Sequence, residues 1–300
     1  MDELERQLRD LVQPSPVELL PDPFGEPVPI RLFLKRDDQL HPLVSGNKWR
    51  KLLYNLLEAR RQQCPTLLTF GGAFSNHLFA TAAAGQVFGF RTIGIVRGDE
   101  LASRPRNPTL AACEAAGMTL WFVSRAEYDQ RHDAAWVARW QAAAGPCYVV
   151  PEGGTNELAI RGTAEGMTEL VAQLGWAPDV VACAVGTGGT AAGLLRAAPA
   201  ATRVLALPVL KGLEPDPVLL AGALWAPDFH FGGYARTTPE LLTFIQGFEA
   251  RTGIRLEQVY TGKLLYGIWQ LARRGYFAPD ARVVAIHTGG LQGRTPQLDA

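Results

Sequence analysis

The stretch VVACAVGTGGTAAGL, residues 180–194, joins an apolar run to a turn rich in glycine and threonine and then to a helix of small residues. The apolar run does not alternate with polar residues, which is typical of a parallel strand covered by helices on both faces. A second run of this kind is RVVAIH, residues 282–287. These runs predict an α/β fold built on parallel sheets.

Short apolar runs alternate with helical patterns along most of the chain, which predicts doubly wound architecture. The predicted strands are Ile30–Arg36, Thr66–Phe70, Arg91–Val96, Thr119–Val123, Cys147–Val150, Val180–Val185, Arg203–Pro208 and Arg282–His287. The predicted helices are Lys48–Arg61, Asn76–Val87, Pro108–Ala116, Ala126–Ala144, Glu157–Leu174, Gly189–Ala197, Pro239–Arg251 and Lys263–Arg273. Two proline-rich stretches, residues 14–29 and 208–217, are predicted to be irregular connections.

The composition favours a protein that acts on small molecules. Lys+Arg and Asp+Glu both number 29 in 300 residues, so there is no basic footprint for nucleic acid. No apolar run approaches membrane-spanning length, and residues 1–12 lack a secretory core, so we expect a cytoplasmic protein of about two domains without a membrane partner. The cysteines lack metal-ligand spacing, so they are expected to be core residues and no metal site is predicted. They are Cys64, Cys113, Cys147 and Cys183.

A lysine at a loop–helix junction is the first candidate for chemistry. The stretch LVSGNKWRKLLYNLL, residues 43–57, places Lys48 between a Ser-Gly-Asn turn and a helix with one apolar face. A lysine anchored by packing tends to lose its proton, and a neutral amine can form a Schiff base with a carbonyl. An ordinary first-turn lysine on a solvated face would give the same pattern.

Ligands of open α/β sheets bind at the carboxyl ends of strands, so the turns that follow the strands are the next candidates. After the strand near residue 70 comes GGAFSNH, in which Ser75 or Asn76 opens a helix. Ser75 is either a simple N-cap or part of a carboxylate site formed by N–H groups at the helix N-terminus, with hydrogen bonds added by Asn76 and His77. Both interpretations fit the sequence.

The turn after Val180–Val185 suits a phosphate group, because successive N–H groups, a helix dipole and threonine hydroxyls can bind one. The turn is neither GxGxxG nor a P-loop, and no acidic residue ends the next strand to bind a ribose, so a phosphorylated cofactor is favoured over a dinucleotide. A purely structural turn is the alternative. The candidate phosphate-binding residues are Gly186, Thr187, Gly188, Gly189 and Thr190.

Three further residues lie beside glycine-containing loops. Thr288 follows the strand that ends near His287, and its hydroxyl could face a ring nitrogen. Tyr234 and Tyr260 could donate or accept a proton in a site. Each of the three could equally be a structural residue of a turn or of the packing.

Taken together, these motifs resemble fold type II pyridoxal-phosphate enzymes, and more closely the 1-aminocyclopropane-1-carboxylate deaminase / D-cysteine desulfhydrase family. The matching pieces are LKRDD, SGNKWRKL, FGGAFSNH, PEGGTN, GTGGTAAG, VYTGK and IHTGG, which span about residues 34–293. The resemblance implies two α/β domains, the smaller inserted in the larger. The large, cofactor-binding domain would comprise residues 1–51 and 158–300, and the small domain residues 52–157. It also implies a homodimer.

The resemblance implies a role for each candidate residue. Lys48 would hold pyridoxal 5'-phosphate as a Schiff base and later move protons. Asn76 would bind the ring hydroxyl, Thr288 would face the pyridine nitrogen, and Gly186 to Thr190 would bind the phosphate. Ser75, with the N–H groups of Asn76 and His77, would bind the substrate carboxylate. Tyr234 and Tyr260 would line the substrate side as acid, base or nucleophile.

Three positions differ from the 1-aminocyclopropane-1-carboxylate deaminases of this family. Those enzymes carry a glutamate at the position of Thr261, a leucine at that of Thr288 and a glutamine at that of His77. A carboxylate near the ring nitrogen would keep that nitrogen protonated and strengthen the ring as an electron sink, which a threonine cannot do. These departures favour elimination over ring opening.

The expected activity is therefore deamination of a small amino acid by Cα deprotonation and β-elimination, giving a 2-oxo acid and ammonia, as in D-cysteine desulfhydrase. The alternatives are ring opening of 1-aminocyclopropane-1-carboxylate to 2-oxobutanoate, a cofactor-binding protein without turnover, and a nicotinamide-dependent oxidoreductase. The last leaves Lys48 and the Ser-Asn-His turn without a role.

Overall fold

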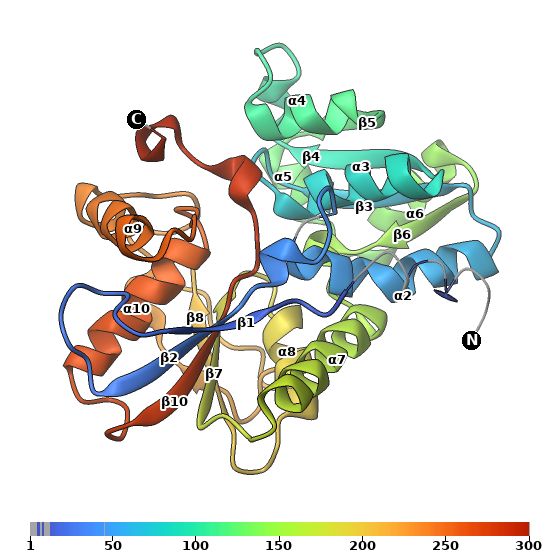
Figure 1. Ribbon diagram of the computed structural model, residues 1–300. Helices are drawn as coiled ribbons and strands as arrows, with labels where there is room; N and C mark the ends of the chain where they lie inside the picture. The colour runs from blue at the N-terminus through green and yellow to red at the C-terminus, as the bar shows by residue number, and fades with distance from the viewer. Residues whose placement is uncertain (1–4, 7, 9–12, 45, 300) are drawn as a thin grey trace.

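The computed structural model describes all residues except 1–4, 7, 9–12, 45 and 300. Most of the amphipathic start of the chain therefore lies outside the described residues, as does Ser45 of the Ser-Gly-Asn turn. Two separate sheets organise the rest, and helices flank both (Figure 1). Among the described helices, none is both long and apolar enough to cross a bilayer.

The larger sheet has six strands in the order β1-β2-β10-β7-β8-β9. They are β1 (Val17–Leu20), β2 (Ile30–Lys35), β7 (Val180–Val185), β8 (Arg203–Pro208), β9 (Leu224–Trp225) and β10 (Ala281–Ile286). All neighbours pair in parallel except β1 with β2. One face packs on α9 (Pro239–Thr252) and α10 (Thr261–Arg273), and the other packs on α7 (Glu157–Leu174) and α8 (Gly189–Ala197). Helices on both faces explain the continuously apolar strands.

The smaller sheet is fully parallel, with the order β5-β4-β3-β6. Its strands are β3 (Thr66–Gly71), β4 (Arg91–Arg97), β5 (Met118–Val123) and β6 (Cys147–Val150). The flanking helices are α2 (Asn47–Arg61), α3 (Asn76–Phe88), α4 (Pro108–Ala115), α5 (Arg125–Tyr128) and α6 (Ala134–Ala144). Short 3-10 turns are η1 (Asp37–Gln39), η2 (Asp99–Leu101), η3 (Glu152–Gly154), η4 (Pro227–Phe229), η5 (Leu291–Gly293) and η6 (Pro296–Leu298).

The predicted doubly wound α/β class with mainly parallel sheets is confirmed, and two local predictions are wrong. The single helix expected over Ala126–Ala144 is two helices, because the Asp133 carboxylate accepts the N–H of Trp136 and caps a new helix. Residues 14–29 are not wholly irregular, since Val17–Leu20 adds an antiparallel edge strand to β2. Prolines at positions 16 and 21 flank this strand, where a missing N–H interrupts no ladder.

A buried ionic cluster joins α2 to the larger sheet. The Arg50 guanidinium donates to the carboxylate of Asp37 at 2.8 Å and to that of Glu169 at 3.0 Å, and Lys35 of β2 also pairs with Glu169. Removing one partner from such a cluster would leave a buried charge uncompensated. The cluster therefore holds α2, which begins one residue before Lys48, against β2 and α7. The boundary predicted at residues 51/52 falls inside this helix, and the domain division stays a prediction.

Candidate active site

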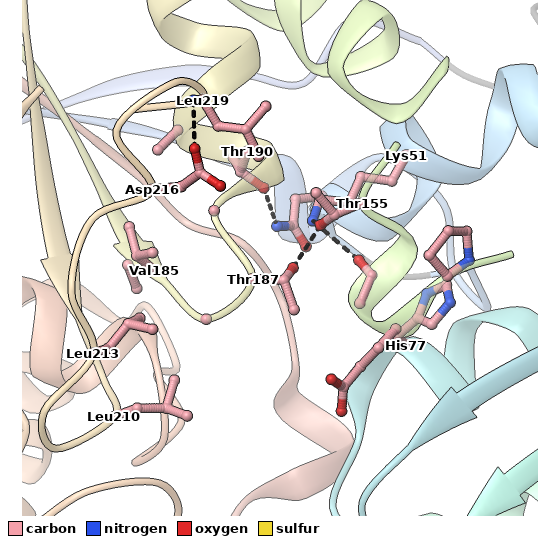
Figure 2. Close-up of a pocket in the computed structure, with 18 of the residues that line it drawn as sticks. Lys51, His77, Thr155, Val185, Thr187, Thr190, Leu210, Leu213, Asp216 and Leu219 are labelled. Atoms are coloured by element: carbon pink, nitrogen blue, oxygen red, sulfur yellow. Dashed lines mark hydrogen bonds between the residues drawn. The ribbon is translucent and has the colours of Figure 1, made fainter. Parts of the chain in front are cut away.

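A cavity of about 520 Å³ collects most of the candidate residues. Figure 2 shows part of its lining, including His77, Thr187 and Thr190. The lining includes Lys48, Ser75, Asn76, His77, Gly186, Thr187, Gly188, Thr190, Tyr260 and Thr288. The other two candidates do not line it: Gly189 is the first residue of α8 beside Gly188, and Tyr234 contacts Tyr260. The cavity takes residues from the carboxyl ends of strands in both sheets, which is where open α/β sheets bind ligands.

Lys48 lies in the first turn of α2, where close backbone contact fixes the helix start. Gly46 has φ of +68°, and a Cβ there would lie 1.9 Å from the carbonyl oxygen of Thr288, so only glycine fits. The Lys48 ammonium lies 3.5 Å from the carbonyl oxygen of Gly153. Burial lowers the pKa of Lys48 from 10.5 to about 8. A substantial fraction of this amine is therefore neutral near physiological pH.

A polar cradle lies one helical turn further along α2. Lys51 is 2% exposed, and its Nζ donates to the Gly153 carbonyl at 3.0 Å and to the Thr155 hydroxyl at 3.3 Å. The Thr155 and Thr187 hydroxyls are 2.6 Å apart, and Asn47 Nδ2 donates to the Thr190 hydroxyl at 2.7 Å. Burial, and then the Lys48 charge, lower the pKa of Lys51 well below its usual value. An anion bound here would oppose both effects.

The cradle has room for a phosphate only because two residues lack a Cβ. A Cβ on Gly189 would lie 2.7 Å from Thr155 Oγ1 and 3.0 Å from Lys51 Nζ, and one on Gly153 would lie 2.5 Å from Thr187 Oγ1. Hydroxyls, a lysine and the N-terminus of α8 form a donor set that matches a phosphate dianion. Lys48 supplies an amine on the same wall of the cavity. Together, the amine and the phosphate donors fit pyridoxal phosphate. Sequence reasoning missed Lys51 and Thr155, although Lys51 sits three residues from Lys48 on one helix face.

The Ser75 turn has the structural role that the sequence allowed. Ser75 Oγ accepts the N–H of Leu78 at 3.2 Å and caps α3. The Asn76 side-chain oxygen Oδ1 accepts from Gln292 Nε2 at 2.7 Å, and Asn76 packs so closely on Gly290 that a Cβ there would lie 2.4 Å from Asn76 Nδ2. Capping leaves the Ser75 hydroxyl proton and the N–H groups of the first helical turn able to bind a carboxylate.

His77 presents an unpartnered nitrogen within this site. Its Nε2 lies 2.8 Å from the Thr69 hydroxyl, whose only proton goes to the Val150 carbonyl at 2.8 Å. The network therefore assigns the proton to Nε2 and leaves Nδ1 as an acceptor, with no partner among the described residues. Burial, followed by the charges of Lys48 and Lys51, holds the pKa of His77 well below its usual value. His77 is thus a neutral acceptor on the cavity wall.

Tyr260 and Tyr234 are neighbours in the site. Their rings meet edge to face with centroids 6.1 Å apart. The Tyr234 hydroxyl donates to the Phe74 carbonyl at 3.0 Å. Burial raises the pKa of Tyr260 well above its usual value and that of Tyr234 to about 12. Both phenols therefore stay protonated at neutral pH, so Tyr260 can act as a proton donor.

Comparison with known proteins identifies the family of the chain. The family model described as "Pyridoxal-phosphate dependent enzyme" matches residues 8–216. The chain belongs to this family. Its cofactor is pyridoxal phosphate, and the predicted cofactor is confirmed.

Several relatives match along most of their length. A Pyrococcus abyssi protein with a provisional 1-aminocyclopropane-1-carboxylate deaminase name is 32% identical, covering 93% of this chain and 90% of that protein. The bifunctional D-cysteine desulfhydrase/1-aminocyclopropane-1-carboxylate deaminase of Arabidopsis thaliana is 31% identical, covering 92% and 76%. A crystal structure described as an "ACC deaminase homologue" superposes with a TM-score of 0.79 at 26% identity, covering 98% and 96%. The family predicted from the sequence is therefore confirmed.

Glu257 does not line the cavity but supports Tyr260 from beside it, a role that the sequence did not reveal. Its buried carboxylate accepts the N–H groups of Val259, Tyr260 and Thr261 at 2.6, 2.7 and 2.5 Å and so caps α10. Burial nevertheless raises the pKa of Glu257. The Thr261 hydroxyl bonds to the same carboxylate at 3.2 Å, and Thr261 does not line the cavity. A carboxylate thus does lie beside Thr261. It belongs to Glu257, one helical turn earlier in the sequence, and not to position 261 itself.

Lys263 supports Tyr234 from the same helix. It is 1% exposed, and its Nζ donates to the carbonyl oxygens of Gly233 at 2.8 Å and His230 at 2.9 Å. Burial lowers the pKa of Lys263 to about 8. Because Gly233 precedes Tyr234 directly, these two bonds fix the loop that presents the phenol. No cluster of metal-ligating side chains occurs in the part of the chain that the structure describes.

Proposed function

We propose that this enzyme deaminates a small amino acid by removing its Cα proton and eliminating a β-substituent. The observation that carries the proposal is the setting of Lys48. Its amine is partly buried in the cavity wall and lies 3.5 Å from a carbonyl oxygen, and desolvation lowers its pKa to about 8. A lysine in this state serves as a nucleophile and then as a base.

Bound pyridoxal phosphate supplies an aldehyde for the Lys48 amine and a ring that takes up the electron pair left at Cα. Lys51, Thr155 and residues Gly186 to Thr190 would hold its phosphate. Asn76, oriented by Gln292, would bind the ring hydroxyl. Thr288, whose carbonyl fixes the start of α2, would place its hydroxyl toward the ring nitrogen.

The protein groups can divide the proton transfers between them. The Ser75 hydroxyl and the N–H groups of Asn76 and His77 would bind the substrate carboxylate. Lys48 Nζ would accept the Cα proton as the bond to the β-substituent breaks, and the substituent would leave with that electron pair. Tyr260, protonated and fixed by Glu257, would protonate a leaving group that needs a proton. Water would then complete the release of ammonia and a 2-oxo acid.

Ring opening of 1-aminocyclopropane-1-carboxylate is the second candidate, favoured by the names of the relatives. That substrate has no Cα hydrogen, so Lys48 would not act there as the base. The neutral His77 and the absence of a carboxylate at position 261 support elimination instead. A relative named D-cysteine desulfhydrase, from Klebsiella pneumoniae, is 28% identical over 92% of this chain. D-cysteine is therefore the first substrate that we propose.

The resemblance also supports a cytoplasmic homodimer with the smaller domain at residues 52–157. Light scattering of the purified protein tests the dimer. A monomeric mass at micromolar concentration would contradict it, without bearing on the chemistry proposed for Lys48.

Borohydride reduction tests the anchoring lysine directly. The chain has five lysines, Lys35, Lys48, Lys51, Lys211 and Lys263, so peptide mapping can identify the reduced adduct without ambiguity. We expect the adduct on Lys48 alone, and we expect Lys48→Ala to lose both the adduct and turnover. Lys48→Arg keeps the positive charge and should fail equally, because a guanidinium stays protonated. Full turnover in either variant would refute the proposal.

A further inference from the structure

Basic side chains gather on the small-sheet side of the cavity. Arg97 is the last residue of β4, and Arg131 and His132 follow α5. All three line the cavity. Because the carboxyl ends of β3, β4, β5 and β6 meet at one edge of the parallel sheet, these residues share that edge with the Ser75 turn.

The acidic groups on this edge are already engaged. Glu152 accepts from the Tyr128 hydroxyl at 2.7 Å and from Arg131 Nε at 2.6 Å, so both of its oxygens are in use. Asp129 lies 3.8 Å from Arg131 and is 73% exposed. None of the described side chains forms a hydrogen bond or ion pair with Arg97. Arg97 therefore has no anionic partner among the described side chains, and Arg131 has N–H groups that remain available for a ligand.

The arginines lie near the reacting centre. Glu152, which holds Arg131, immediately precedes Gly153, whose carbonyl oxygen faces both Lys48 and Lys51. Consecutive Cα atoms are about 3.8 Å apart, so the Arg131–Glu152 pair is within a side chain's reach of the amine. Arg97, at the end of β4, lines the same cavity as Lys48 and Arg131.

Two other carboxylates line the cavity, and they belong to a different part of it. Asp216 accepts the N–H groups of Val218 and Leu219 at 2.9 and 2.8 Å. Figure 2 shows Asp216 beside Leu219, on the side of the cavity away from His77. Glu214 is two residues away in the same loop. Apart from Glu152, which is paired with Arg131, the carboxylates that line the cavity thus lie away from its arginine edge.

We propose that Arg97 and Arg131 bind a second anionic group on the substrate, so that the enzyme prefers amino acids whose side chain ends in an oxyanion. This inference rests on the proposed elimination. The phosphate and the α-carboxylate already have donors in the cradle and the Ser75 turn. A side-chain carboxylate, sulfonate or phosphate would take the remaining arginine donors in charge-assisted bonds.

The corresponding reaction is balanced without a further reagent. The Cα–H bond and the bond from Cβ to sulfur or oxygen break, and the Cα electron pair forms the Cα=Cβ bond. Sulfite or phosphate leaves with the electrons of its bond to Cβ. One water then replaces nitrogen at the former Cα, giving pyruvate and ammonia.

Binding of aspartate and asparagine to the holoenzyme tests the inference without turnover. The two differ in charge but barely in shape, and neither carries a ready β-leaving group. Calorimetry would use both enantiomers of each amino acid. We expect aspartate to bind at least tenfold more tightly than asparagine. Arg97→Gln should remove most of that preference, and Arg97→Lys should keep part of it. Arg91→Gln, at the opposite end of the same strand, is the matched control and should change nothing.

Elimination assays then identify the anion. Pyruvate formation is compared for cysteate, O-phosphoserine and 3-chloroalanine, in both enantiomers. A kcat/KM preference for cysteate assigns a sulfonate, and a preference for O-phosphoserine assigns a phosphate. Equal affinity for aspartate and asparagine, no binding of either, or an Arg97→Gln variant with an unchanged preference would overturn the inference. Pyruvate from 3-chloroalanine alone would overturn it while sustaining elimination, and no pyruvate from any substrate would refute the elimination itself.

Discussion

The hydroxyl of Tyr234 donates to the carbonyl oxygen of Phe74 at 3.0 Å, joining a loop that precedes α9 to the turn that follows β3. The Tyr234 ring also packs edge to face on that of Tyr260, and Phe74 directly precedes Ser75. The proposed proton donor and the proposed carboxylate-binding turn are therefore linked through Tyr234, by a ring contact on one side and a hydrogen bond on the other. Movement of the small sheet away from the large one would break this link.

Removing the two phenols separately should have unequal effects. Tyr260 lines the cavity, whereas Tyr234 reaches it through Tyr260. We expect Tyr260→Phe to lower kcat for β-elimination about 10²–10⁴-fold, the range for loss of a positioned acid. Tyr234→Phe should lower kcat less and mainly raise KM, because it frees the Ser75 turn. Steady-state kinetics with D-cysteine measure both. Equal losses would show that the phenols act as one unit.

The polar cradle predicts a selective loss of cofactor affinity. A Cβ on Gly189 would lie 2.7 Å from Thr155 Oγ1, so Gly189→Ala should exclude the phosphate. We expect its Kd for pyridoxal phosphate to rise at least tenfold while its Kd for pyridoxal, which lacks the phosphate, changes little. Lys51→Met should behave likewise. Fluorescence titration of the apoprotein measures both constants. A parallel rise for the two ligands would place the phosphate elsewhere.

The lowered pKa of Lys48 sets the pH dependence of cofactor attachment. Only the neutral amine attacks the aldehyde, so the attachment rate should rise about tenfold per pH unit below 8 and level off above it. Nα-acetyl-lysine with the same cofactor is the control, and its rate should keep rising toward pH 10.5. Stopped-flow absorbance at several pH values gives both profiles. A protein profile that matches the control would mean that burial does not lower this pKa.

A glutamate at position 261 should destabilise the protein rather than create a ring-opening enzyme. Thr261 is 1% exposed and faces the Glu257 carboxylate, so Thr261→Glu would bury a second negative charge beside the first. We expect the free energy of unfolding to fall by roughly 3 kcal/mol or more. The control is Thr261→Gln, whose side chain is as large as that of glutamate but neutral, and its free energy of unfolding should fall less. The double variant Glu257→Gln with Thr261→Glu should recover much of the lost stability. Denaturant melts measure each value. A stable single variant that yields 2-oxobutanoate would show that position 261 controls the reaction.

The repeated elements and the strand-end turns were predictable, because their signals are local. Val180–Val185 and Glu157–Leu174 occupy the predicted residues, since apolar runs, caps and glycine stops define them within a few positions. The Gly-Thr turn and the Ser-Asn-His turn also carry their donors in one segment. The rule that ligands bind at strand ends was enough to predict that they meet.

The supporting residues were not predictable, because their partners are distant in sequence. In the sequence, Glu257 and Lys263 look like ordinary charged residues near the end of a helix. Only the fold shows that Glu257 is buried against Thr261, and Lys263 against the loop before Tyr234. Arg97 and Arg131 belong to different elements, and only the parallel order of β4 and β5 brings them to one edge. The split at Asp133 was missed because small, helix-favouring residues continue on its far side, so one capping side chain decides the boundary.

The identity of the 2-oxo acid released by the holoenzyme tests the central claim most directly. D-cysteine and 1-aminocyclopropane-1-carboxylate would be supplied separately, with Lys48→Ala as the blank. The account predicts pyruvate from D-cysteine, no 2-oxobutanoate from the cyclopropane compound, and neither product from the variant. Release of 2-oxobutanoate without pyruvate would contradict the elimination assigned to Lys48 and Tyr260.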